Sequence, residues 1–169
     1  FAPDTYMEKI AIGPNFPKGL VDLDHSVEKN ITNLAEAKNT TPDKLTVCIL
    51  ERPRHDKIIS SLKKMNVNLK LISDGDVSGI IYIVNSNSPV DMYIGTGGGP
   101  EGVLAAAALS CYNGQMQTRL VLNNKEATRA QNMGIKDLKK NKKNKGYEKG
   151  GGKVWGKGNN CGRLSEGNK

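Results

Sequence analysis

The chain has 169 residues and a formal net charge of +8 at pH 7. This length suffices for one domain with a buried core, and no apolar run approaches the roughly 18 residues that span a bilayer. The excess charge lies in residues 136–169, which hold 11 basic and 3 acidic residues, whereas residues 1–135 hold 14 of each. A neutral body argues against a nucleic-acid-binding protein, and a basic tail of this kind is more often simply solvated.

The cysteines and the first residues bear on the cellular context. The three cysteines are an odd number without paired spacing: Cys48, Cys111 and Cys161. They argue against a disulfide or a metal site and fit a reducing cytoplasm. No signal peptide is visible, and the chain begins at Phe1 without an approach segment. We therefore expect that it was cut from a longer polypeptide.

Apolar spacing predicts an alternation of strands and helices along the chain. Strands are expected at residues 7–12, 45–50, 67–72, 90–94 and 116–122, and helices at 24–38, 56–65, 77–84, 102–111 and 125–133. Residues 77–84 fit either structure, and we favour a helix because another strand follows. The alternation predicts an α/β fold with a largely parallel sheet. We assign residues 1–138 to this fold and residues 139–169 to a poorly ordered tail rich in Lys, Asn and Gly.

Polar residues follow three of the predicted strands, where ligands bind in parallel sheets. Arg52 and Arg54 follow one strand, and Asp74 and Asp76 follow the next. Arginine forks grip phosphate oxygens, whereas carboxylates accept hydrogen bonds from sugar hydroxyls or bind metal. The plain alternatives are solvated arginines and an ordinary turn through Asp-Gly-Asp. We expect His55, which lies beside the arginines, to be structural rather than catalytic.

Residues 94–102, read as I-G-T-G-G-G-P-E-G, follow the third strand. A strand, a glycine loop and a helix that begins near Pro100 would present backbone N–H groups to an anion. Glu101 is a hard oxygen ligand for a divalent cation, although a tight loop with a helix-capping acid is an equal alternative. The spacing of Gly97, Gly99 and Gly102 matches a dinucleotide fingerprint only weakly, because no acid follows about 20 residues on. No lysine follows as in a P-loop.

Together, segments of the sequence resemble the class II fructose-1,6-bisphosphatases. They are A-P-D-T-Y-M-E-K at 2–9, R-P-R-H-D at 52–56, I-S-D-G-D-V at 72–77 and I-G-T-G-G-G-P-E-G-V at 94–103. These enzymes are cytoplasmic, oligomeric sugar phosphatases that depend on Mn²⁺ or Mg²⁺ and serve gluconeogenesis. Their layered α/β sandwich is of the inositol monophosphatase type. Some also act on sedoheptulose 1,7-bisphosphate.

The resemblance implies a role for individual residues. The substrate would contact Tyr6, Arg52, Arg54, Asp74, Gly75, Asp76 and Gly98, and Glu101 would bind metal. The implied partners are a sugar bisphosphate and further copies of the chain, as a dimer or tetramer, but no membrane. No catalytic residue is assigned, because the half of the family sequence that supplies most metal carboxylates is absent. We expect Glu101 alone to support little or no turnover.

Two other functions remain open at this stage. One is an inositol-phosphatase-like phosphomonoesterase of the same fold, which only substrate preference would distinguish. The other is a non-catalytic module that binds phosphate or nucleic acid through the basic tail. The neutral charge of residues 1–135 and the lack of interleaved aromatic residues count against binding of nucleic acid.

Overall fold

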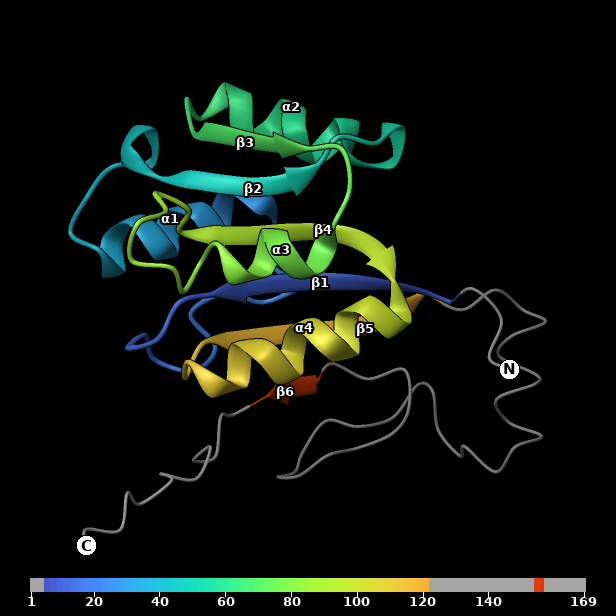
Figure 1. Ribbon diagram of the computed structural model, residues 1–169. Coiled ribbons are helices and arrows are strands. Elements are labelled where there is room, and N and C mark those ends of the chain that lie inside the picture. The colour runs from blue at the N-terminus through green and yellow to red at the C-terminus, as the bar shows by residue number, and fades with distance from the viewer. Residues whose placement is uncertain (1–4, 122–153, 157–169) are drawn as a thin grey trace, which may run out of the picture.

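The computed structural model describes residues 5–121 and 154–156, which form a six-stranded sheet flanked by helices (Figure 1). The strands are β1 (Tyr6–Ile12), β2 (Thr46–Leu50), β3 (Asn68–Ile72), β4 (Met92–Gly98), β5 (Gln115–Val121) and β6 (Val154–Gly156). The helices are α1 (Val27–Ala37), α2 (Asp56–Lys64), α3 (Asp76–Ile81) and α4 (Gly99–Cys111), with short 3₁₀ turns η1 (Pro42–Lys44) and η2 (Pro53–His55). The α/β class predicted from the sequence is confirmed.

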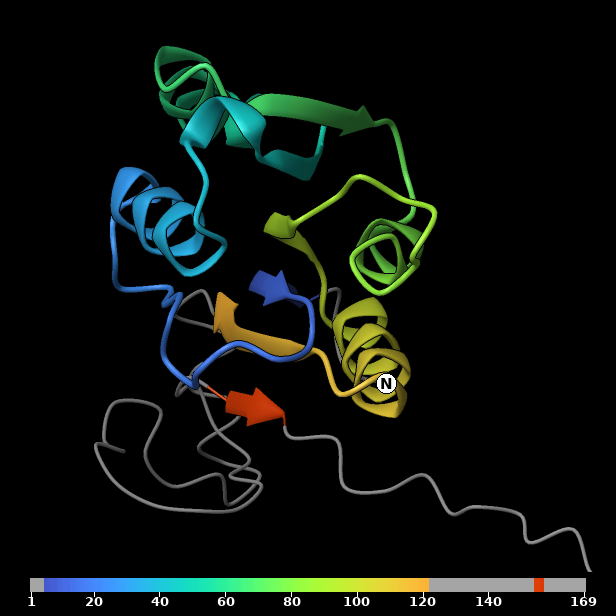
Figure 2. The same ribbon diagram turned by 90° about the vertical axis from the view of Figure 1, so that its left-hand side faces the viewer.

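The helices lie on both faces of the sheet, with α1 and α2 on one side and α3 and α4 on the other (Figure 2). Alternate residues of each central strand therefore enter different cores. Val47 and Ile49 of β2 pack in the core under α1 and α2. Cys48, between them, packs in the core under α3 and α4. This burial on both faces explains why β2 reads as a continuous apolar run.

The sheet is mixed, so the expectation of a largely parallel sheet is wrong. The strand order is β3-β2-β4-β1-β5-β6. Strand β2 is parallel to β3 and β4, but β1 is antiparallel to both of its neighbours, β4 and β5. Apolar periodicity reports which face a residue occupies but carries no information on strand direction. The direction of β1 places Tyr6 beside Gly98, at the end of β4 where α4 begins.

Most predicted elements are present, with shifts at their ends. Residues 77–84 were expected to be helical, and α3 confirms this. Strand β4 continues through Gly98 and α4 begins at Gly99, so no glycine loop separates them. The expected helix at 125–133 lies outside the described residues. So does the expected poorly ordered tail at 139–169, except for residues 154–156, which form β6 and pair with β5. No helix in the described ranges has the length and apolar character to cross a membrane.

The two cores predict different reactivity for the two described cysteines. Cys48 is fully buried, and burial raises the pKa of its thiol to about 11. Cys111, on α4, is exposed. Iodoacetamide at pH 8 should therefore alkylate Cys111 in the folded protein and reach Cys48 only after denaturation, because the thiolate is the nucleophile. Peptide mass spectrometry before and after adding urea measures this, and equal labelling rates in the folded protein would contradict the fold.

Candidate functional site

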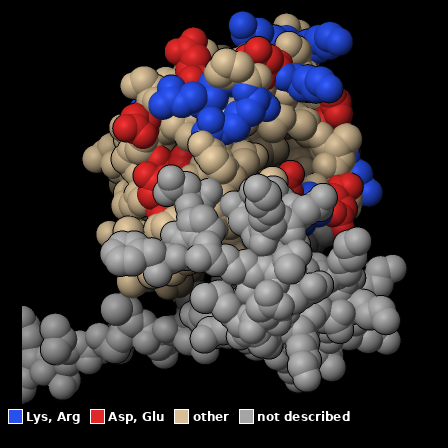
Figure 3. Space-filling view, turned by 90° about the vertical axis from the view of Figure 1, so that its right-hand side faces the viewer, with Lys and Arg blue, Asp and Glu red and all other residues tan. Residues whose placement is uncertain are grey.

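A cleft opens where β2, β3 and β4 end and β1 begins. It has a volume of about 320 Å³ and is lined by Thr5, Tyr6, Leu50, Arg52, Arg54, Asp74, Asp76, Gly97, Gly98, Pro100 and Glu101. All of the candidate site residues expected from the sequence line this cleft except Gly75, which lies between two that do. On this side of the molecule, basic and acidic side chains occur close together (Figure 3). The cleft is therefore polar and mixed in charge.

The two arginines stand on the turn that follows β2. Arg54 Nε donates to the Thr96 carbonyl at 2.7 Å, and its guanidinium carbon lies 5.3 Å from the centroid of the Tyr6 ring. Arg52 Nη1 donates to the Glu51 carbonyl at 3.2 Å. Arg54 is thus held by a hydrogen bond and a cation–π contact. Among the described residues no further hydrogen bond engages its terminal amino groups, so they could receive an anion with little loss of side-chain entropy.

His55 fixes this turn to β4. Its Nδ1 lies 2.7 Å from the Leu50 carbonyl, and its Nε2 accepts from the Thr96 N–H at 2.8 Å. The ring is therefore the neutral tautomer that donates from Nδ1. Burial lowers the pKa of His55, and only in part do its backbone hydrogen bonds oppose that shift. The expectation of a structural histidine agrees with these contacts.

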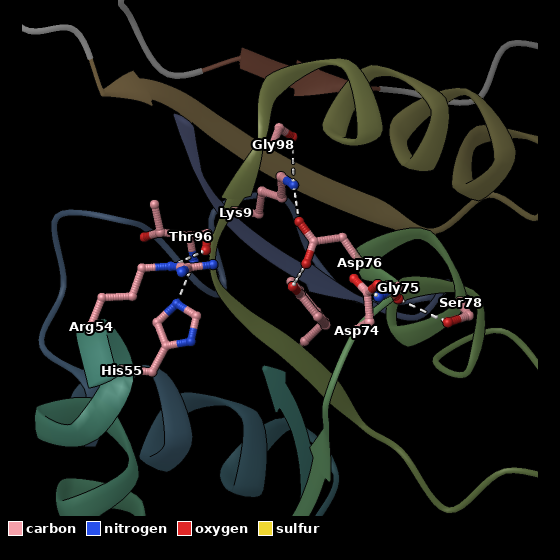
Figure 4. A network of polar contacts seen from close by, with 10 residues as sticks. Lys9, Arg54, His55, Asp74, Gly75, Asp76, Ser78, Thr96 and Gly98 are labelled. Atoms are coloured by element: carbon pink, nitrogen blue, oxygen red, sulfur yellow. Dashed lines mark hydrogen bonds and ion pairs between the residues drawn. The ribbon is translucent and has the colours of Figure 1, made fainter. Parts of the chain in front are cut away.

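The Asp74-Gly75-Asp76 segment is a tight turn, and its two acids differ in environment. Gly75 has a φ of 89°, which favours glycine, and its N–H donates to Asp74 Oδ1 at 2.8 Å. The Ser78 hydroxyl donates to the Gly75 carbonyl at 2.8 Å. Asp74 is exposed, whereas Asp76 is buried at the start of α3. The turn expected as the plain alternative is present, and it directs Asp76 inward, toward Lys9, while the exposed Asp74 lies beside Gly75 (Figure 4).

The partner of the inward acid is Lys9, which sequence reasoning missed. Lys9 is fully buried, and its ammonium forms an ion pair with Asp76 Oδ2. The same ammonium donates to the Gly98 carbonyl at 2.9 Å (Figure 4). Tyr93 donates its hydroxyl to Asp76 Oδ1 at 2.6 Å. Burial, and then this bond to Asp76, raise the pKa of Tyr93, so the phenol remains a donor.

The position of Lys9 in the sequence indicates that its side chain faces the core. Strand residues alternate between faces, and Lys9 shares the face of its neighbour Ala11, which lies in the core under α3 and α4. A lysine at a core-facing position requires a buried partner, because an unpaired buried charge is too costly. The identity of the partner could not be read from the sequence, because Asp76 lies 67 residues away.

The glycines of β4 and α4 leave room for these polar groups. A Cβ atom on Gly97 would lie 1.9 Å from Asp76 Oδ2, and one on Gly98 would lie 2.6 Å from Glu101 Oε2. A Cβ atom on Gly102 would lie 2.5 Å from Met7 Sδ and 2.9 Å from Lys9 Cε. Among the described glycines, only Gly19 and Gly75 have a positive φ. The glycine run is therefore required for space rather than for unusual backbone angles.

The first turn of α4 is less open to an anion than the sequence indicated. The Gly99 N–H donates to the Thr5 carbonyl at 2.7 Å, and Pro100 has no N–H to offer. Glu101 lines the cleft and is exposed. Within residues 5–121, however, no three Asp, Glu, His or Cys side chains form a group that could hold a metal ion. These residues do not make up a complete divalent-cation site, and the role of Glu101 stays a prediction.

Fold and cleft together define an α/β protein with arginines and carboxylates gathered at its strand ends. The chain belongs to the bacterial, glpX-encoded fructose-1,6-bisphosphatase family, whose model matches residues 1–146. It is 41% identical over 123 residues to the Haemophilus influenzae class 2 fructose-1,6-bisphosphatase. It is 42% identical over 120 residues to fructose-1,6-bisphosphatase 1 class 2 of Escherichia coli.

A third relative has a name that includes a second activity. The chain is 39% identical over 120 residues to the Synechocystis D-fructose 1,6-bisphosphatase class 2/sedoheptulose 1,7-bisphosphatase. These matches cover 73%, 71% and 71% of this chain. They cover only 37%, 35% and 34% of the relatives, so the chain spans about a third of the length of the curated relatives it matches. The family is thus established, whereas the activity of the whole protein is a separate question.

The buried imidazole predicts a pH dependence of folding stability. The folded pKa of His55 lies below the ordinary value of 6.5, so between those two values only the unfolded chain binds the proton. His55 should therefore lower the free energy of unfolding as the pH falls below about 6.5. Urea unfolding at pH 7.5 and 5.5 measures the difference, which should shrink in His55→Gln and persist in His25→Gln. An equal pH dependence in all three proteins would contradict the buried neutral tautomer.

Proposed function

We propose that this chain forms the substrate-binding part of a fructose-1,6-bisphosphatase. That enzyme hydrolyses the 1-phosphate of fructose 1,6-bisphosphate to fructose 6-phosphate and phosphate, as one step of gluconeogenesis. The observation that carries the proposal is the meeting of Arg52, Arg54 and Asp74 around one cleft in a chain of this family. A phosphorylated sugar needs both kinds of group, because its phosphate attracts cations and its hydroxyls donate to carboxylates.

The arginines bind a phosphate group of the substrate. Arg54 is oriented by Thr96 and Tyr6 before any ligand arrives, and Arg52 lines the cleft beside it. Charge-assisted hydrogen bonds to a phosphate are about twice as strong as neutral ones. Tyr6 contacts the substrate at the edge of the same subsite. These residues position the phosphate but transfer no proton, so none is assigned a catalytic role.

The sugar is recognised by the turn between β3 and α3. Asp74 is exposed and accepts hydrogen bonds from hydroxyls, whereas Asp76 already serves Lys9 and Tyr93. Asp74 is therefore the principal acceptor for the sugar hydroxyls. Asp76 and the backbone of Gly75 make the secondary contacts with the sugar. Gly98 lets the substrate approach the backbone because it has no side chain.

Mn²⁺ or Mg²⁺ would supply charge neutralisation and an activated water to such an enzyme. Glu101 is the described residue that suits such an ion, since both ions prefer oxygen ligands. The other ligands would have to come from outside the described residues. We accordingly derive no chemical step from this chain.

The family resemblance also implies finer features. We assign the sheet and helices to a layered sandwich of the inositol monophosphatase type, with residues 1–138 as the substrate-binding unit and residues 139–169 as a tail that adds β6 to the sheet. We further propose a cytoplasmic homo-oligomer, a dimer or tetramer. Sedoheptulose 1,7-bisphosphate is a second candidate substrate, favoured by the name of the Synechocystis relative. An inositol phosphate is a weaker candidate.

Removing one arginine should weaken binding of the substrate. A hydrogen bond to a charged group contributes about 1.5–3 kcal/mol, so Arg54→Gln should raise the Kd for fructose 1,6-bisphosphate at least about tenfold. Isothermal titration measures the Kd, with fructose and NAD as control ligands. Lys57→Gln is the matched control, because Lys57 is exposed on α2 and does not line the cleft. A folded Arg54→Gln protein with unchanged Kd would count against the proposal.

The purified chain should bind substrate without hydrolysing it. One carboxylate cannot assemble a divalent site, and the described residues lack a group of three ligands. Release of inorganic phosphate from fructose 1,6-bisphosphate in the presence of Mn²⁺ measures turnover, and we expect none above a blank without protein. Metal-dependent release that disappears in Glu101→Gln would overturn this expectation.

A further inference from the structure

We propose that Lys9 is a positioning residue, which sets the spacing between the two halves of the cleft. One half is the turn that carries Asp74. The other half is the junction of β4 and α4, where Glu101 lines the cleft. This inference rests on the proposed function, since it assumes that the cleft binds a sugar bisphosphate. It goes further by assigning a task to a buried residue that contacts no ligand.

The contacts of Lys9 join three elements that meet at the cleft. Lys9 stands on β1, and its ammonium binds both Asp76 on α3 and the carbonyl of Gly98 at the end of β4. Tyr93, lower on β4, donates to the other oxygen of Asp76 at 2.6 Å. Asp76 is therefore held from two sides at once. The turn before α3 cannot move relative to β4 unless one of these bonds breaks.

The arrangement is costly, which argues that stability alone does not explain it. Burying an ion pair loses hydration that its attraction often fails to repay, and apolar replacements of similar volume are often neutral or stabilising. Here the chain also lacks a side chain at Gly97, where a Cβ atom would collide with the Asp76 carboxylate. Such a network confers a fixed geometry that an apolar core, with its non-directional contacts, does not.

That geometry is transmitted directly to the candidate site residues. Asp74 precedes Asp76 by two residues, through the left-handed Gly75. Glu101 follows Gly98 in the first turn of α4, and its carboxylate lies over the space that a Cβ on Gly98 would occupy. Lys9 thus supports the segments that carry Asp74 and Glu101 without contacting either of those two carboxylates. Loosening it should misplace Asp74 and Glu101 together. Arg54 should stay in place, because it donates to the Thr96 carbonyl and His55 holds the Thr96 N–H.

The test is a double-mutant cycle with Lys9→Met, Asp76→Asn and the two combined. Lys9→Met alone leaves a buried unpaired carboxylate and should melt at a lower temperature than wild type. The combined variant has no unpaired charge and should regain most of that loss. The Kd for fructose 1,6-bisphosphate is measured by titration for each folded protein. Lys38→Met is the control, because it breaks the ion pair with Asp91 away from the cleft.

We expect the combined variant to bind at least tenfold more weakly than wild type, and no more weakly than the weaker single variant. Lys38→Met should bind like wild type. Binding by the combined variant within twofold of wild type would show that Lys9 only neutralises Asp76 and would overturn the proposal. Losses that multiply in the combined variant would also overturn it, since Lys9 would then act independently of Asp76.

Hydrogen exchange separates failure of this inference from failure of the proposed function. If wild type and Lys38→Met both show no saturable binding, the proposed function fails, and exchange alone decides the role of Lys9. Peptides covering residues 74–78 and 98–103 should then exchange faster together in the combined variant, with residues 55–62 unchanged. Unaltered exchange in both segments would overturn the positioning role.

Discussion

The cleft depends on the direction of one strand. Because β1 runs antiparallel between β4 and β5, its first residue lies beside Gly98, at the edge where β2, β3 and β4 end. Tyr6 can therefore stack on Arg54, and Lys9, three residues further on, reaches Asp76 and Gly98. A parallel β1 would deliver both side chains to the opposite edge of the sheet. The antiparallel insertion is thus what gathers residues from four strands at one site.

Two polar links attach the surrounding turns to the adjacent strands β4 and β1, and they differ in kind. His55 is neutral and accepts from a backbone N–H, so it fixes the arginine turn without introducing a buried charge. The carboxylate turn is fixed by an ion pair instead, and its strength depends on both partners remaining charged. At both contacts the facing residue of β4 is a glycine: Gly95 lies against the His55 imidazole, and Gly97 lies against the Asp76 carboxylate. The glycines of β4 thus leave room for both links.

The sequence was informative where the local pattern determines the outcome. Arg52 and Asp74 could be grouped because each follows a buried apolar run, and strand ends of one direction share an edge. The resemblance then assigned their neighbours. Lys9 could not be paired in this way, since its partner is distant in sequence and reaches it only through the fold. The end of β4 was misplaced because glycine usually indicates a loop, whereas here it keeps an extended strand clear of Asp76 and Glu101.

The charges of the cleft explain why the buried pair matters for an anionic ligand. Arg52 and Arg54 face Asp74 and Glu101 across the same cleft, so these four side chains sum to zero. Asp76 would make the sum negative, but the charge of Lys9 cancels that of Asp76 within the protein.

The arginines attract a phosphate only to the extent that other groups bind the two exposed carboxylates. Hydroxyl groups at Asp74 and a cation at Glu101 would engage them, and both are features of a metal-dependent enzyme that binds phosphorylated sugars. A ligand with phosphate but no hydroxyls would bring its negative charge beside Asp74 without donating a hydrogen bond to that carboxylate. The cleft is for that reason better suited to a sugar phosphate than to a polyanion that has no hydroxyl groups.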